Sequence, residues 1–211
     1  MARTVSEAAP KRKTKRGQDA KARRIGTEQS KTRAAFLDAT EALVREKGYA
    51  AVTTRHVAKR AGHKSQLVHY YFRNIDDLLI NVWQRFADKN LARHADAMFA
   101  GQPLWELWDF NRNRSDTIFY LEFMALARHR KAIRDEMAKD GRRVRAIQLN
   151  SVGKTFEKLD LAQRGWTPMI LITVMVSIAR TLVLESGHKF SLGHKEMADF
   201  VERWIKEVEG Q

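Results

Sequence analysis

Apolar side chains recur at helical spacing along most of the chain after residue 30. Phe36, Ala39 and Leu43 lie on one face of a first predicted helix, which covers about residues 30–47. Gly48 fits its end, since glycine is the residue favoured directly after the last helical turn. The sequence therefore predicts a long first helix that ends at a glycine.

Two short helices are predicted directly after it. Thr53 and Thr54 are good N-cap residues for a helix that runs from Thr54 to Ala61. Gly62 interrupts this helix, and the helical period resumes at Leu67. Two short helices around a glycine turn, packed on a longer first helix, are typical of a helix-turn-helix, although ordinary helical bundles contain the same turn.

The second of these short helices has two chemically different faces. Val68 and Phe72 supply apolar anchors for an inward face. The outward face offers hydrogen-bond donors and acceptors from Ser65, Gln66, His69 and Tyr70. A helix of this kind fits a DNA major groove, which is about 12 Å wide, so these side chains are candidates for reading base edges.

The rest of the chain is also predicted to be helical. Asn74 with Asp77 resembles a capping box, which starts a fourth helix with an apolar stripe that includes Val82 and Phe86. Further helices are expected over roughly 103–116, 117–131, 133–160, 167–186 and 194–208. The predicted fold class is therefore all-α.

The most apolar run, residues 168–179, can be interpreted in three ways. Its β-branched residues alternate with period two, which is the period of a strand. No second convincing strand is present to pair with it. Arg180 ends the run before the roughly 20 apolar residues that a membrane span needs. A buried helix is therefore favoured.

The last two predicted helices both have broad apolar faces. The final one presents Leu192, Met197, Phe200, Val201, Trp204, Ile205 and Val208. Two such faces can pack on each other within one subunit or on a second copy of the chain.

Positive charge is concentrated in the first third of the sequence. The formal net charge is +14, and residues 1–33 alone hold eleven basic and three acidic side chains. Residues 34–75 hold seven basic and three acidic side chains, so the rest of the chain is nearly neutral. Because Lys and Arg that neutralise phosphates release counterions, this asymmetry favours a polyanionic partner. No apolar anchor accompanies the basic residues, which argues against a membrane surface.

The N-terminal segment is too polar to form a core. Apart from Met1, residues 1–26 contain only two large apolar side chains, Val5 and Ile25, so we expect them to be disordered when free. They are interpreted either as a solvated tail or as a flexible basic arm that follows the DNA backbone or enters a minor groove.

Composition and motifs give no support to an enzyme. The chain has no cysteine, which excludes disulfides, thiolate metal sites and cysteine nucleophiles. The seven histidines form no metal-binding pair, and no glycine-rich phosphate loop or paired-carboxylate motif is present, so neither a metal nor a cofactor is expected. Arg142, Arg143 and Arg145 are interpreted as one solvated helix face. The N-terminus lacks a signal peptide, which favours the cytoplasm.

Three segments resemble the N-terminal DNA-binding domain of TetR-family transcriptional regulators. They are the stretch from Gly48 to Gly62, the stretch from Leu67 to Phe72, and Asp77-Leu78-Leu79. The specific resemblance covers about fifty residues. The remainder fits the family in length, helicity and its C-terminal amphipathic helix.

The resemblance implies a role for several side chains. Thr54 and Tyr71 correspond to phosphate contacts, and Arg55 to a position from which some members reach a base. Ser65, Gln66 and His69 correspond to base-facing positions. The complete predicted DNA-binding set is Thr54, Arg55, Lys64, Ser65, Gln66, His69, Tyr70, Tyr71 and Arg73.

Three positions differ from the family pattern. His63 replaces an apolar turn residue, Lys64 replaces a serine cap, and Ile75 replaces a lysine that often opens the fourth helix. The lost lysine removes one phosphate contact, which Arg73, Lys64 or the basic arm could replace.

Aromatic side chains cluster in the middle of the chain. They are interpreted either as plain core or as the lining of an apolar effector pocket. Glu122 lies among them and either contacts a ligand or pairs with a nearby arginine. The predicted pocket residues are Trp105, Trp108, Phe119, Tyr120, Glu122 and Phe123.

The sequence thus predicts a basic arm (1–29), a three-helix helix-turn-helix domain (30–75) and a helical effector-binding and dimerisation domain (76–211). The resemblance implies a repressor that binds a palindromic DNA operator as a homodimer and is released by a small-molecule effector. One alternative is a structural nucleic-acid-binding protein without an effector. Another is a small-molecule-binding protein whose basic tail is incidental.

Overall fold

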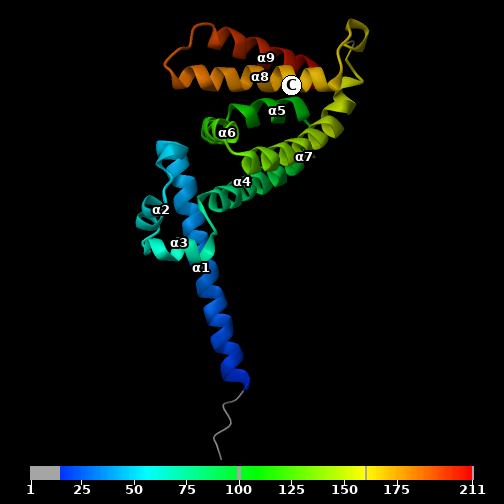
Figure 1. The fold of residues 1–211 in the computed structure, drawn as a ribbon. Coiled ribbons are helices and arrows are strands. Elements are labelled where there is room, and N and C mark those ends of the chain that lie inside the picture. The colour runs from blue at the N-terminus through cyan, green and yellow to red at the C-terminus, as the bar shows by residue number, and fades with distance from the viewer. Residues whose placement is uncertain (1–14, 99–100, 160, 211) are drawn as a thin grey trace, which may run out of the picture.

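Figure 1 shows the protein as a computed structural model, which describes residues 15–98, 101–159 and 161–210. Side chains are described from residue 31 on, apart from residues 97–100, 160 and 211. The helices are α1 (Lys15–Lys47), α2 (Thr54–Arg60), α3 (Ser65–Tyr71), α4 (Ile75–Met98), α5 (Pro103–Arg112), α6 (Arg114–Ala127), α7 (Lys131–Phe156), α8 (Pro168–Gly187) and α9 (His194–Glu209), with 3-10 turns η1 (Tyr49–Ala51) and η2 (Ala162–Arg164). No strand occurs within these described ranges, and the predicted all-α fold class is confirmed.

Helix α1 begins well before the predicted start near residue 30. Its first described residue is Lys15, so the helix includes residues 15–26 of the segment that was expected to be disordered. That stretch contains no proline and is rich in Lys, Arg and Ala, all of which have favourable helix propensities. Residues 1–14 of the predicted arm lie outside the described residues.

Helices α2 and α3 pack beside the C-terminal half of α1 at one end of the molecule (Figure 1). Each of the three helices contributes an almost completely buried side chain to one apolar cluster. These are Phe36 of α1, Val57 of α2 and Val68 of α3. Phe72, directly after α3, is buried in the same core. The apolar positions that predicted these three helices therefore form their common core.

The remaining helices form a bundle that shares this core. Helix α4 leads out of the small N-terminal group and lies side by side with α7 (Figure 1). Val82 of α4 and Phe123 of α6 belong to the same continuous apolar cluster as Phe36. A second cluster joins α5, the end of α7, α8 and α9. The first cluster contains side chains from α1 to α3 and from α4 and α6. A shift of α4 or α6 would therefore change the packing of α2 and α3.

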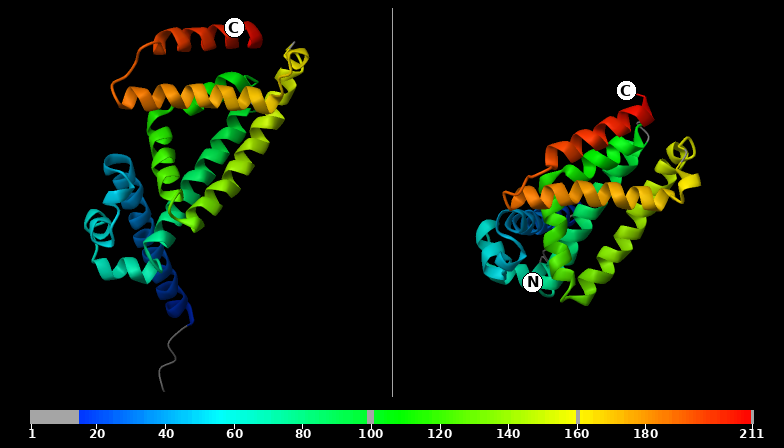
Figure 2. Two further views of the ribbon diagram at one scale, coloured as in Figure 1. Left: turned by 45° about the horizontal axis from the view of Figure 1, so that its top comes forward. Right: turned by 90° about the horizontal axis from the view of Figure 1, so that it is seen from above.

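Helices α8 and α9 lie at the opposite end of the molecule from α2 and α3 (Figures 1 and 2). The apolar run from residue 168 is a helix, as predicted, with Thr167 as its N-cap. Its burial differs from the prediction, because Ile172 and Ala179 are buried while Ile170 and Val174 are exposed. By length and mean hydropathy α8 would suit a membrane, but a single helix of this kind is weak evidence since core helices of water-soluble proteins share these properties. One face of α8 therefore packs on the core and the other remains exposed.

Candidate nucleic-acid interface and cavity

The loop before α2 places that helix by side-chain capping. Thr53 has an extended backbone and its hydroxyl accepts a hydrogen bond from the His56 backbone N–H at 3.2 Å, as expected of an N-cap. Thr54 therefore takes the first position inside the helix and is half-buried. Arg55, the next residue, is exposed.

Helix α3 presents the two predicted faces. Val68 is buried, and Phe72 closes the helix with its ring in the core. The exposed polar positions are Lys64 before the helix, Ser65, Gln66, His69, Tyr70 at 67% exposure, and Arg73 after the helix, and apolar Leu67 is also exposed, at 38%. The polar face that was predicted to meet base edges is therefore open to solvent.

Aromatic contacts fix the flanks of α3. The rings of His63 and Tyr71 lie 5.4 and 5.9 Å from the ring of Phe36. His63 thus takes the packing role of the apolar turn residue that it replaces. Lys64 is the N-cap of α3 and makes no side-chain capping hydrogen bond, so the first backbone N–H groups of the helix lack that partner.

Arg73 and the start of α4 form a small polar motif. The Asn74 side chain accepts a hydrogen bond from the Asp77 backbone N–H at 2.8 Å, which is one half of the predicted capping box. The Asp77 carboxylate in turn accepts from the Arg73 backbone N–H at 3.0 Å, and the hydrogen bonds from Arg73 lower the pKa of Asp77. The Arg73 side chain also pairs with the Asp77 carboxylate at 3.3 Å, although it is 87% exposed.

Further basic side chains lie on α2 and in the turn before α3. Arg55, Lys59 and Lys64 are exposed and form no salt bridge with any described residue. Arg60 is different, because it pairs with Glu46 of α1. Three uncompensated cations beside an exposed polar helix give a surface suited to a phosphate backbone.

A separate cavity lies inside the bundle formed by α4, α5, α6, α7 and α8. Its volume is about 130 Å³, which is below the roughly 300–1,000 Å³ of pockets for drug-sized ligands. It is lined by Trp83, Phe86, Ala87, Asn90, His94, Phe110, Asn111, Asp116, Thr117, Tyr120, Met137, Asp140, Gly141, Val144, Arg145, Gln148, Val176 and Arg180.

Only Tyr120 of the predicted pocket residues lines this cavity. Phe119 and Phe123 are buried in the first apolar cluster, and their rings pack on each other at 4.9 Å. Trp105 and Trp108 belong to the second cluster, far along the bundle from α2 and α3. These aromatic residues are core, which was the other interpretation of the same pattern.

The charged side chains of the cavity were not predicted as ligand contacts. Arg145 was expected on a solvated helix face, but it is half-buried and lines the cavity. Burial lowers the pKa of Arg145, and the positive charge of Arg180 lowers it further. His94 is 2% exposed, and its burial lowers its pKa to about 4, so the ring is neutral at pH 7. These residues come from three helices that only tertiary packing brings together.

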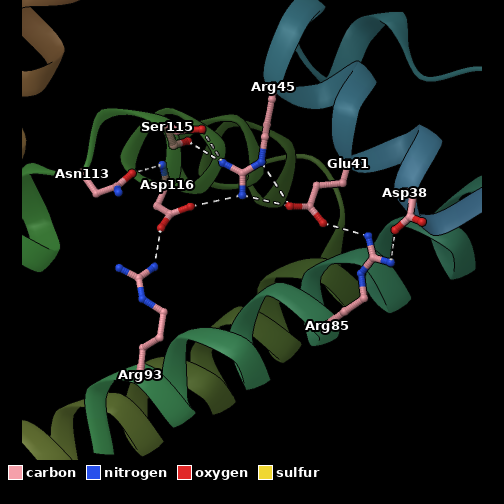
Figure 3. A network of polar contacts seen from close by, with 8 residues as sticks. All are labelled: Asp38, Glu41, Arg45, Arg85, Arg93, Asn113, Ser115 and Asp116. Atoms are coloured by element: carbon pink, nitrogen blue, oxygen red, sulfur yellow. Dashed lines mark hydrogen bonds and ion pairs between the residues drawn. The ribbon is translucent and has the colours of Figure 1, made fainter. Parts of the chain in front are cut away.

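A network of ion pairs links one wall of the cavity to α1 (Figure 3). Asp116, at the start of α6, accepts hydrogen bonds from Arg45 of α1 at 3.1 Å and from Arg93 of α4 at 2.9 Å. Arg45 also donates to the Ser115 backbone carbonyl and to Glu41. A displacement of Asp116 would therefore also move Arg45 of α1, the helix on which α2 and α3 pack.

Glu122 makes a second link between the two parts of the molecule. Its carboxylate accepts a hydrogen bond from the Tyr49 backbone N–H at 2.8 Å, so in this structure its partner is the loop before α2. Among the described residues no arginine pairs with Glu122, so the predicted arginine partner is replaced by a backbone N–H. Local sequence patterns cannot predict such a contact, because Tyr49 and Glu122 are 73 positions apart.

Gly48 makes this approach possible. Its φ of 76° is positive, as expected after a helix, while its ψ of 167° is extended, a combination found almost only in glycine. A Cβ there would lie 3.0 Å from Glu122 Oε2.

Replacing Gly48 with alanine is therefore expected to lower the free energy of unfolding by about 2 kcal/mol, from backbone strain and the close contact. Chemical denaturation measures the change. Gly153→Ala within α7 is the matched control, since its added methyl meets open space and should stabilise the helix slightly. Equal stability of G48A and the wild type would contradict this account of the loop.

Comparison with known proteins identifies the N-terminal part. Residues 36–82 match the family of bacterial regulatory proteins, tetR family. This segment is a TetR-family DNA-binding domain. The predicted resemblance to TetR regulators is thereby confirmed for α1 to α4, and no curated protein matches the chain as a whole.

Solved structures extend the likeness beyond that domain. A proposed TetR-family transcriptional regulator from Rhodococcus has a TM-score of 0.67 at 17% identity and covers 85% of this chain and 99% of its own. A TetR-family regulator from Marinobacter aquaeolei VT8 has a TM-score of 0.61 at 19% identity, covering 86% and 97%. A TetR regulator from Haloarcula marismortui has a TM-score of 0.59 at 21% identity, covering 85% and 97%. At these identities the likeness shows the fold, which is that of TetR-family transcriptional regulators.

The end of this TetR-like fold far from α2 and α3 carries exposed apolar side chains. Phe200 of α9 is 60% exposed and Leu192, just before α9, is 84% exposed. Further exposed apolar residues are Met169, Ile170, Val174, Leu184, Phe190 and Met197. An open groove between α8 and α9 is lined by several of them. Exposed apolar surface on two neighbouring helices is typical of an association site.

Proposed function

We propose that this protein is a ligand-responsive transcriptional repressor that binds a palindromic operator as a homodimer in the cytoplasm and is released by a small-molecule effector. The observation that carries the proposal is the exposed polar face of α3, with Gln66 and His69 outward and Val68 and Phe72 holding the helix from behind. Arg55 of α2, which is exposed and forms no salt bridge with a described residue, supports the same partner.

Dimerisation is supported by the apolar surface of α8 and α9. A single seven-residue helix offers few base contacts, whereas a two-fold dimer reads two half-sites about 34–36 Å apart. The exposed face of α8 and Phe200 of α9 are the surfaces that we assign to the second copy.

Release by an effector is supported by the position of the cavity. Asp116 lines the cavity and is also bound to Arg45 of α1. A ligand that favours another placement of α6 would therefore favour another placement of α1 to α3. Because such coupling is reciprocal, DNA would weaken effector binding by the same factor as effector weakens DNA binding.

Selection of bound sequences from a random pool of DNA duplexes tests this proposal. We expect a symmetrical motif whose half-sites are about one helical turn apart. A protein that retains duplexes of every composition equally would instead be the structural nucleic-acid-binding protein that was considered from the sequence.

Replacing Gln66 with alanine is expected to relax the preference at one base pair of each half-site. A glutamine that reads adenine through two hydrogen bonds contributes about 1–3 kcal/mol of discrimination. The same selection, repeated with Q66A and separately with H69A, measures the change position by position. Lys59→Ala is the matched control, because a lost phosphate contact should weaken binding to all sequences alike. Unchanged specificity in both Q66A and H69A would argue against α3 as the reading helix.

A further inference from the structure

Two arginines of the cavity have no carboxylate partner among the described residues. Arg145 donates to the Gln148 side-chain oxygen at 3.2 Å. Arg180 donates to the Asn111 side-chain oxygen at 3.2 Å and lies over the ring of Tyr120. All of these partners are neutral, so two positive charges face one cavity without compensation.

The carboxylates of the same cavity are already engaged. Asp116 is bound by Arg45 and Arg93, as described above. Asp140 is buried, accepts a hydrogen bond from the Trp83 indole N–H at 2.9 Å, and pairs with Arg143 at 3.1 Å. Each of these acids is therefore already paired with an arginine that does not line the cavity, while Arg145 and Arg180 have no carboxylate partner among the described residues.

His94 adds an unused polar atom. Its Nδ1 is buried and has no hydrogen-bond partner among the described residues, while its ring stacks on Phe110 at 3.7 Å. A buried polar atom without a partner destabilises a folded protein, so such atoms often mark a site that a ligand completes. In the tautomer with a proton on Nδ1, the neutral ring can donate one hydrogen bond to an anion.

Apolar side chains form much of the remaining wall of the cavity, beside the polar side chains of Asn90 and Thr117. Trp83, Phe86 and Phe110 supply aromatic surface, and Met137 and Val176 supply aliphatic surface. The volume of about 130 Å³ limits the occupant to a small molecule. The apolar part of the wall thus suits the apolar portion of a compact ligand, and the two guanidinium groups suit a negatively charged group at one end of that ligand.

We propose that the cavity binds a small organic carboxylate, whose oxygens meet Arg145, Arg180 and His94 Nδ1 and whose apolar body lies against the aromatic wall. The proposal names the chemical class of the ligand. It rests on the proposed function in one respect, which is that this ligand is also the effector that releases the protein from DNA. Arginine suits this role because its planar fork of donors matches a carboxylate.

Thermal unfolding of the full chain with millimolar benzoate, phenylacetate or hexanoate tests this binding. At least one of these acids is expected to raise the Tm in proportion to the logarithm of its concentration. Benzamide, phenylacetamide and hexanamide have the same shapes without charge and should leave the Tm nearly unchanged. Equal shifts by an acid and its amide, or no shift by any acid, would overturn the proposal.

Two substitutions locate the binding. Arg145→Gln and Arg180→Gln should each weaken the affinity for the active acid by about tenfold or more, which is the loss of one charged hydrogen bond. Arg142→Gln is the control, since Arg142 is exposed on the same helix and does not line the cavity. Full affinity in R145Q and R180Q would overturn the assignment of these two arginines.

The ligand-free protein gives an independent readout. Because Arg145 faces a second uncompensated cation, R145Q should unfold at a higher temperature than the wild type, whereas R142Q should not. A lower Tm in R145Q would mean that Arg145 stabilises the fold, and would count against a preformed anion site. None of these measurements involves DNA, so their failure is distinguishable from failure of the operator selection.

Discussion

Phe200→Glu is expected to convert the protein into a folded monomer that binds its operator about a hundredfold more weakly or worse. Phe200 is 60% exposed on α9, so the substitution leaves the core of one subunit intact. In a dimer the substitution would place an unpaired carboxylate in an apolar interface. The loss of dimerisation free energy should exceed that caused by truncating a side chain at the centre of an interface. Analytical ultracentrifugation measures the mass, circular dichroism the fold, and fluorescence anisotropy the operator affinity.

Lys206→Glu on the same helix is the matched control. Lys206 is exposed and lies about two turns along α9 on a different face, so the added negative charge should leave dimerisation intact. Trp204 is a poorer probe, because it is half-buried against the second apolar cluster and its replacement would disturb the subunit itself. A dimer of normal stability in F200E would place the interface on another surface.

Local periodicity was sufficient to predict the helix-turn-helix. Val68 and Phe72 are buried and Gln66 and His69 are exposed, because a seven-residue helix beside a larger core has only one way to place its apolar residues. The same reasoning placed Asn74 and Asp77 at the start of α4. In these cases the residues that determine a structure lie within a few positions of one another.

The cavity could not be predicted in this way. His94, Arg145 and Arg180 belong to three helices and meet only when α4, α7 and α8 pack together. A local cluster of aromatic residues pointed instead to Phe119 and Phe123, which are four positions apart and therefore share one buried helix face. Nothing in the sequence distinguishes Arg145 from the other arginines of its basic run, although Arg145 alone of them lines the cavity.

The missed contact of Glu122 has the same origin and bears on function. Glu122 and Asp116 both lie on α6, and each binds the part of the chain that supports α2 and α3. Helix α6 therefore contacts the cavity on one side and the DNA-binding part on the other. A small rotation of α6 is the simplest way in which an occupied cavity could change the position of α3.

Acidification from pH 7 to pH 4 is expected to cost the protein about 3 kcal/mol of stability through His94 alone. Burial, together with the charges of Arg93 and Arg180, lowers the pKa of His94 to about 4, against about 6.5 in the unfolded chain. Between these values the unfolded state binds a proton that the folded state does not. Stability contributed by the neutral ring is therefore complete above pH 6.5 and is lost as the pH falls toward 4.

Urea denaturation at a series of pH values, compared between the wild type and His94→Gln, isolates this effect. H94Q retains a polar side chain but cannot titrate, so its stability should fall much less between pH 6.5 and 4. His188→Gln is the control, because His188 is exposed and its replacement should leave the pH dependence of the wild type unchanged. Parallel pH profiles for H94Q and the wild type would show that His94 titrates alike in both states.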